Sequence, residues 1–336
     1  MDTVPIMTEV MRVFDPLLET RVGDPVKYSL FPIQHQDVYE MYKQAVASYW
    51  VVEEVDLSKD KADYDRLSSA EQNFVKHVLA FFAVSDAIVN ENLATNFSEE
   101  VVAQEAKSFY AIQQAMEAIH GECYSLLIDT LISDQTEKAD LFNAVATMPA
   151  VAVKAAFMQK YMTRRNSFEE RLVAFACAEG ILFSSSFAAI YFFKKSNLMP
   201  GLSMSNLMIS RDEGLHAKFA CLLYSKLRNK LSMERVQEIV TEAVRVERDF
   251  VQSALSQDIL GINADEMMQY VQMIADRLLV DLGSDKIFGS KNPFLWMNSI
   301  CLQGNTNFFE LRNDSYSKAN VGASAEECVF DTECDF

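Results

Sequence analysis

Two short segments of the chain carry the same pair of residue types at the same spacing. Glu117 and His120 form one Glu-x-x-His motif, and Glu213 and His216 form the second. Both motifs lie in long stretches whose apolar residues recur with the period of a helix. Because residues three apart are neighbours on one helix face, each motif can direct a carboxylate and an imidazole to one point.

A single carboxylate precedes each motif at a similar distance. Asp86 lies 31 residues before Glu117, and Glu179 lies 34 residues before Glu213. Asp86 falls in the middle of an apolar helical stripe, and a buried carboxylate must be paired or must bind a metal. The resulting order of carboxylate, Glu-x-x-His, carboxylate and Glu-x-x-His is the ligand arrangement of helix bundles that bind two iron or two manganese ions.

The predicted ligand set contains four carboxylates, two imidazoles and no thiolate: Asp86, Glu117, His120, Glu179, Glu213 and His216. Oxygen-rich sites of this kind suit iron or manganese, whereas structural zinc prefers a closed tetrahedron of Cys and His. We expect two iron ions per chain, with manganese as the alternative, and oxygen activation as the natural chemistry. The competing interpretation is a pair of buried salt-bridge networks, but only Arg211 lies near these residues to balance their charge.

One tyrosine accompanies only one of the two motifs. Tyr124 lies four residues after His120 on the same helix face, whereas Ala220 occupies the equivalent position after His216. Beside a metal site that makes strong oxidants, Tyr124 is a candidate radical; the alternative is an ordinary buried tyrosine with a hydrogen-bonded hydroxyl. Three apolar residues on stripes that face the site are expected to give it a dry pocket, or to serve only as core packing: Phe183, Phe187 and Ile209.

The composition favours a helical, acidic protein. Of the 336 residues 50% are hydrophobic, and only 10 are Gly and 7 Pro, which favours long helices over turns. A net charge of −18 argues against non-specific binding to nucleic acid. The six cysteines form no Cys-x-x-Cys pair and indicate a reducing compartment. The N-terminus lacks the basic start and apolar core of a signal peptide, so we expect a cytoplasmic protein.

One apolar stretch is long enough to cross a membrane. Leu172 to Phe193 contains a single charge, Glu179, in 22 residues. We interpret the stretch as a helix buried on all sides of a large bundle, because the other ligand-bearing segments are not membrane-like. We therefore expect no membrane association.

The pattern predicts an all-α protein with three regions: an N-terminal arm over residues 1–33, a helical domain over residues 34–320 and a flexible tail over residues 321–336. Ser68 and Glu71 form a capping box that should open the helix of Asp86, and Ser203 is the expected N-cap of the helix bearing Glu213. The other expected helices lie near His35–Trp50, Glu99–Leu131, Thr136–Thr147, Val151–Tyr161, Leu172–Lys195, Ser232–Ser256 and Asn263–Leu282.

Several longer runs resemble one enzyme family. SDAIVNENL, AMEAIHGECYSLLIDT, VAFACAEGILFSSSF and ISRDEGLHAKFACL are similar to the small, radical-generating subunit of class I ribonucleotide reductase, in its eukaryotic and viral form. FPIQHQDVYEMYKQAVASYW, NPFLWM and GNTNFFE share this resemblance, which extends from about residue 25 to the end of the chain.

The resemblance implies a ferritin-like di-iron bundle with additional helices, which forms a homodimer. It assigns Asp86, Glu117 and His120 to one iron, and the other three ligands to the second. It makes Tyr124 the stable radical. The radical is then relayed to a large catalytic subunit, which reduces ribonucleoside diphosphates to deoxyribonucleotides for DNA synthesis. The residues implied in radical transfer are Trp50, Asp212 and Tyr316.

The last seven residues, FDTECDF, resemble the peptide that docks on the large subunit. The implied docking residues are Phe330, Asp335 and Phe336. The segment departs from the family pattern at Glu333, where Asp is commoner, which leaves the affinity for the partner open. Short acidic segments with isolated aromatics bind by placing a few anchors in a preformed groove.

Two other functions remain open at this point. An iron-storage protein of the ferritin type would bind the same metals, but it would need neither Tyr124, Trp50 nor an acidic aromatic tail. A structural partner that stabilises another small subunit would contain little iron, and a metal assay would identify it.

Deletion of residues 330–336 is expected to leave iron binding and the Tyr124 radical intact, because the tail is separate from the metal ligands. It should abolish nucleotide reduction in a mixture with the large subunit. Each buried Phe contributes roughly 1.5–3 kcal/mol before the cost of ordering the tail, so we expect micromolar docking that salt weakens. Full turnover by the truncated protein would show instead that docking uses the folded surface.

Overall fold

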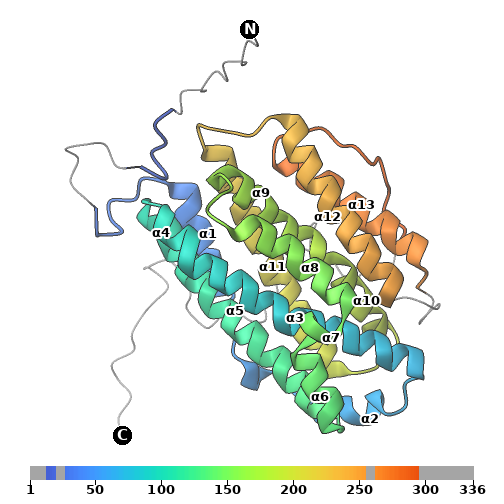
Figure 1. The fold of residues 1–336 in the computed structure, drawn as a ribbon. Helices are drawn as coiled ribbons and strands as arrows, with labels where there is room; N and C mark the ends of the chain where they lie inside the picture. Colours follow the sequence, from blue (N-terminus) through green and yellow to red (C-terminus); the bar gives the residue numbers. More distant parts are fainter. Residues whose placement is uncertain (1–12, 20–26, 255–261, 295–336) are drawn as a thin grey trace, which may run out of the picture.

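The computed structural model describes residues 13–19, 27–254 and 262–294 (Figure 1). It is 75% helical, and the described residues contain no strand, which confirms the all-α prediction. The predicted relay residue Tyr316 and the docking residues Phe330, Asp335 and Phe336 lie outside the described residues.

The helical elements follow one another with short connections. The larger ones are α1 Gln36–Ala47, α3 Ser69–Asn92, α5 Gln104–Leu131, α8 Pro149–Met162, α9 Phe168–Cys177, α10 Ser184–Lys195, α11 Pro200–Lys226, α12 Met233–Ala254 and α13 Ala264–Asp281. The shorter ones are η1 Val52–Glu54, α2 Asp60–Tyr64, η2 Leu93–Phe97, α4 Ser98–Glu100, α6 Gln135–Phe142, α7 Ala144–Thr147 and η3 Ala178–Leu182, of which η2 and η3 are π-helical.

Four long helical stretches form the centre of the bundle. The helix α3 packs along α5, and α11 packs along the continuous stretch of α9, η3 and α10 (Figure 1). The helices α8, α12 and α13 cover one side, while α1 packs against α5 and α11. The core between them is mainly aliphatic and aromatic, so each charged residue buried in it needs a partner or a bound cation.

The helix that carries Asp86 begins as predicted. The backbone N–H of Glu71 donates to Ser68 Oγ at 3.3 Å, and the backbone N–H of Ser68 donates to Glu71 Oε2 at 2.7 Å. This reciprocal pair satisfies two amides that the first turn of a helix leaves free. The capping box predicted from the sequence is therefore confirmed.

Two predicted helices are interrupted in the structure. The helix expected over Glu99–Leu131 begins only at the start of α5, because the chain before it is extended and Val102 N donates to Leu17 O at 2.8 Å. The helix expected over Thr136–Thr147 is divided into α6 and α7 at Asn143, whose backbone leaves the helical region. The break before α5 depends on a contact between segments that are far apart in the sequence. The periodicity of the apolar residues does not reveal such a contact.

The predicted N-cap of α11 is wrong. Ser203 lies inside the first turn, and the residue before the helix is Met199, in a left-handed conformation. The cap comes from a distant helix: Gly201 N donates to Asp60 Oδ1 at 2.9 Å, and Leu202 N donates to Asp60 Oδ2 at 2.6 Å. A carboxylate is favourable at this position because the N-terminal end of a helix carries partial positive charge. The buried Asp60 thus fixes the start of the helix that carries the second Glu-x-x-His.

Two helical stretches, Ser69–Glu100 and Phe168–Lys195, are long and apolar enough to span a membrane by length and composition. The most apolar window of the second is buried throughout, and that of the first is 56% buried. Every residue from Leu172 to Phe193 is buried, as expected for a core helix.

The Gly201→Ala variant is expected to lower the free energy of unfolding by about 1–3 kcal/mol, the usual range for overpacking. A Cβ at this position would lie 2.6 Å from both the backbone oxygen of Asp56 and Leu57 Cδ2, and backbone cannot move aside cheaply. Denaturant unfolding measures the loss. The control is Gly121→Ala in α5, where a Cβ meets nothing within 4 Å and should stabilise the helix by up to about 1 kcal/mol. Equal effects of the two variants would contradict the close approach at Gly201.

Candidate metal centre

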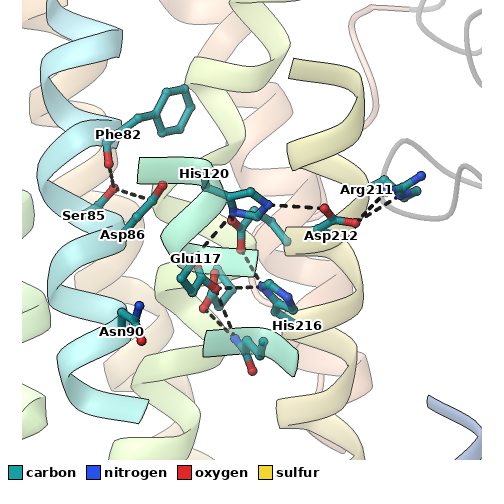
Figure 2. A network of polar contacts seen from close by, with 12 residues as sticks. Phe82, Ser85, Asp86, Asn90, Glu117, His120, Arg211, Asp212 and His216 are labelled. Atoms are coloured by element: carbon teal, nitrogen blue, oxygen red, sulfur yellow. Dashed lines mark hydrogen bonds and ion pairs between the residues drawn. The ribbon is translucent and has the colours of Figure 1, made fainter. Parts of the chain in front are cut away.

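The structure brings all six predicted ligands together in the middle of the bundle. Asp86 extends from α3, Glu117 and His120 from α5, and His216 from α11 (Figure 2). The remaining two ligands come from the π-helical segment η3 and from α11: Glu179 and Glu213. None of the six is more than 2% exposed. Residues that are up to 130 positions apart in the sequence therefore converge in a water-excluded interior.

The ligand atoms form two groups that share one residue. Within each group they lie within 4.8 Å of one another. One group contains Asp86, Glu117 and His120, and the other contains Glu117, Glu179, Glu213 and His216. The resemblance assigned three ligands to each metal; the structure adds that Glu117 is in reach of both positions.

The two imidazoles each face the glutamate of the opposite motif. His120 Nδ1 lies 2.9 Å from Glu213 Oε1, and His216 Nδ1 lies 3.0 Å from Glu117 Oε1. His216 Nδ1 also lies 3.0 Å from Glu213 Oε2 in its own motif. The two motif glutamates therefore lie between the two rings, where a carboxylate can bridge two cations.

The charges of this cluster are poorly balanced by the protein. Burial raises the pKa of Asp86 and of Glu179 well above the usual range, and neighbouring carboxylates raise both further. Burial alone would lower the pKa of His216, but the charges of Glu213 and Glu117 outweigh it and raise this pKa to about 9. Protons thus take the place of cations in the metal-free protein, and a bound metal displaces them.

Several oxygens of the cluster are buried without a partner. Asp86 Oδ2, Glu117 Oε2 and Glu179 Oε2 have no hydrogen-bond partner among the described residues. A buried carboxylate oxygen in this state is costly unless a cation binds it. Within the described ranges, no lysine or arginine forms an ion pair with the four carboxylates of the cluster, so the salt-bridge interpretation does not fit. The donor set fits two divalent cations.

One more polar residue, Gln113, contacts the ligand set and is not among the residues singled out from the sequence. Its Nε2 lies 3.3 Å from Glu179 Oε1 and 3.5 Å from Glu117 Oε1, and the side chain is buried. A neutral donor can orient two carboxylates without adding charge to a crowded site. Its position, four residues before Glu117 and therefore on the same helix face, is the feature of the sequence that could have indicated this contact.

Trp50, Asp212 and Arg211 connect the ligand set to the chain just after α1. Trp50 Nε1 donates to Asp212 Oδ2 at 2.8 Å, and His120 Nε2 lies 3.3 Å from the same oxygen. The other oxygen, Asp212 Oδ1, accepts two hydrogen bonds from Arg211 (Figure 2). The guanidinium of Arg211 also donates to Ser48 O at 2.7 Å. Asp212 therefore pairs with Arg211 and also connects Trp50 to a predicted ligand.

Tyr124 stacks on one ring of an aromatic cluster. Its ring stacks on Phe82 at 4.5 Å between centroids, and Phe82 in turn contacts Phe187 at 5.0 Å and Phe183 at 5.7 Å. Ile209 is also buried in the core. The structure thus places Phe82, which sequence reasoning did not assign to the pocket, directly against the tyrosine. The hydroxyl of Tyr124 has no hydrogen-bond partner among the described residues, unlike an ordinary buried tyrosine.

The environment keeps the phenol of Tyr124 neutral. Burial raises its pKa well above the usual value of about 10. The negative charges of Asp86 and Glu213 raise it further. The proton therefore stays on the phenol at physiological pH.

Comparison with known proteins gives a consistent result. Residues 27–293 match the family model described as "Ribonucleotide reductase, small chain". The chain is 51% identical over 323 residues to the ribonucleoside-diphosphate reductase small chain of Yaba-like disease virus, which covers 96% of this chain and 98% of the relative. It is 53% identical to the small chain of Nicotiana tabacum, with 92% and 93% covered.

A solved structure supports the same assignment. The Rnr4 homodimer of ribonucleotide reductase from Saccharomyces cerevisiae has a TM-score of 0.74 and 32% identity, with 86% of this chain and 92% of that chain covered. The helical architecture of this chain and its convergent ligand set agree with the expected ferritin-like fold. The chain belongs to the family of ribonucleotide reductase small chains.

Proposed function

We propose that this small chain holds two iron ions and uses oxygen to oxidise Tyr124 to a stable radical. A large catalytic subunit then takes up the oxidising equivalent and reduces ribonucleoside diphosphates. The observation that carries the proposal is the environment of Tyr124: the side chain is buried, its hydroxyl has no hydrogen-bond partner among the described residues, and its ring stacks on Phe82. It adjoins one half of the ligand set, and Ala220 occupies the matching position in the other half.

The six ligands divide between two metals in this proposal. Asp86 and His120 hold the metal nearer Tyr124, whereas Glu179, Glu213 and His216 hold the second. Glu117 reaches both, which supports a bridging role. Bound ferrous iron would supply two of the four electrons that reduction of oxygen needs, Tyr124 would supply one, and an external one-electron reductant would supply the last. The same donor set accepts manganese, which is the alternative.

The protein itself controls the proton of Tyr124. Oxidation of a phenol makes its proton strongly acidic, so a base must receive it. Asp86 is the carboxylate whose charge acts most strongly on the phenol. We assign Asp86 as the acceptor of this proton. Phe82, Phe183 and Phe187 exclude water and offer no competing polar group.

The contacts of Trp50, Asp212 and His120 support a transfer path out of the metal site. Trp50 is fully buried, whereas the next residue in the chain, Val51, is 37% exposed. We propose that the oxidising equivalent leaves through these residues and passes to Tyr316 and the partner. Docking by Phe330, Asp335 and Phe336 and assembly into a homodimer, as in the yeast relative, belong to the same proposal.

Iron storage and a purely structural role are less well supported. A storage protein has no use for a tyrosine stacked in an apolar pocket or for the link between Trp50 and the ligand His120. A structural partner without metal would have no reason to bury four carboxylates in one place. Three cysteines are free and buried, Cys123, Cys177 and Cys221, which supports a reducing compartment such as the cytoplasm.

Tyr124→Phe is expected to remove the tyrosyl signal in electron paramagnetic resonance after ferrous iron and oxygen are added to the metal-free protein. Iron content should not change, because only a hydroxyl is lost and the ring still fills its pocket. The matched control is Tyr110→Phe on the same helix, since Tyr110 is also buried with an unpaired hydroxyl among the described residues. If the signal survived in the first variant and disappeared in the control, Tyr110 would be the radical and the proposal would be wrong.

Anaerobic ferrous iron is expected to raise the thermal stability of the metal-free protein, because the metals balance buried carboxylates. At a hundredfold excess over the dissociation constant, each site stabilises by about 2.7 kcal/mol. Glu117→Gln should lose most of this increase, since Glu117 serves both positions. Glu105→Gln is the control: Glu105 is buried on the same helix but accepts from Gln34 N at 2.6 Å instead. A full iron-induced shift of the melting temperature in the Glu117 variant would contradict the shared ligand.

A further inference from the structure

An ion pair is buried in the core outside the ligand set. Lys154 Nζ on α8 lies 2.7 Å from Glu247 Oε2 on α12, and neither side chain is exposed. The ammonium also lies over the rings of Phe81, at 3.8 Å, and Phe250, at 3.5 Å. Removing two charges from water is costly, and apolar residues of similar size often serve stability equally well. Stability alone is therefore a poor explanation for the pair.

Both members of the pair bind the helix that carries Glu179. Lys154 Nζ donates to Leu182 O at 2.6 Å, and Leu182 is the last residue of the π-helical segment η3. Glu247 Oε1 accepts from the hydroxyl of Ser185 and from its backbone N–H, at the start of α10. The pair therefore contacts the chain on both sides of the junction between η3 and α10.

The π-helical segment determines where Glu179 points. A π-helical turn holds one more residue than an α-helical turn, and successive residues of an α-helix are rotated by about 100°. If η3 relaxed to a regular α-helix, Glu179 would turn by about that angle relative to α10. Its carboxylate, now 3.3 Å from Gln113 Nε2, would then leave the ligand group. Short π-helical segments need support from neighbouring side chains, since their hydrogen-bond pattern differs from that of the flanking helix.

We propose that Lys154 and Glu247 are positioning residues that hold η3 in the register directing Glu179 to the second metal. The inference rests on the proposed function, because it requires that this ligand group bind a metal. Neither residue touches the ligand atoms, and both act through the backbone of η3 and the first turn of α10. The pair thereby connects α8 and α12 to η3, the segment in which the α-helical hydrogen bonding is interrupted at the ligand Glu179.

The decisive variant is the double replacement Lys154→Met and Glu247→Leu. Each single replacement leaves one buried charge without its partner and unfolds more readily, whereas the double replacement fills the space with apolar atoms. Ser185 can turn its hydroxyl to a carbonyl of its own helix. We expect the double variant to melt within a few degrees of the parent chain. We expect it to bind Mn²⁺ at one site as before and at the second about tenfold or more weakly.

Anaerobic calorimetric titration of the full, metal-free chain with Mn²⁺ measures both sites. Glu179→Gln should show the same weakened second site. Adding the double replacement to Glu179→Gln should weaken binding little further, because the pair acts through Glu179. The control pair is Arg171 and Glu100, which are joined at 2.6 Å near the start of α9, away from η3. Replacing that pair with Met and Leu should leave both Mn²⁺ sites unchanged.

Unchanged binding at both sites in the double variant would overturn the inference, as would additive losses when it is combined with Glu179→Gln. Loss of the second site with preserved folding, and without further loss in the combination, would support it. If the parent chain bound fewer than two Mn²⁺ ions, the proposed function would itself be wrong, and the positioning role would fall with it.

Discussion

Four carboxylates and two imidazoles are confined to a dry interior that supplies no lysine or arginine to them within the described residues. Such a cluster is stable only when protons or metal cations balance its charge. The packing of α3, α5, η3 and α11 brings these ligands to one place, and Glu117 belongs to both ligand groups in this crowded interior.

The polar anchors of the fold support these helices. Asp60 caps the start of α11, the Lys154–Glu247 pair contacts the junction after η3, and Arg211 with Trp50 fixes Asp212 behind His120. Each anchor joins segments that are far apart in the sequence. Apolar packing is non-directional and tolerates small shifts, whereas ligand geometry does not. Hydrogen bonds and ion pairs to buried charges provide that missing directionality.

Sequence reasoning succeeded where the signal was local. The repeated Glu-x-x-His and the capping box at Ser68 depend on a spacing of three residues, which a helix fixes. It failed at α11, where Ser203 was a sensible local cap but Asp60, 141 residues before Gly201, provides the actual one. The π-helical segment η3 could not be predicted from the sequence either. It lies in a continuous apolar stretch, where one extra residue in a turn does not change the hydrophobic pattern. Trp50 and Asp212 were chosen by family resemblance alone, and their hydrogen bond is a tertiary contact.

The central claim is that the six convergent residues hold two metal ions. Anomalous diffraction from crystals grown with ferrous iron or Mn²⁺ tests it most directly, since it locates each metal without relying on activity. Two peaks per chain are predicted, one among Asp86, Glu117 and His120 and the other among Glu179, Glu213 and His216, with Glu117 in contact with both. A single peak, or peaks away from these residues, would contradict the account.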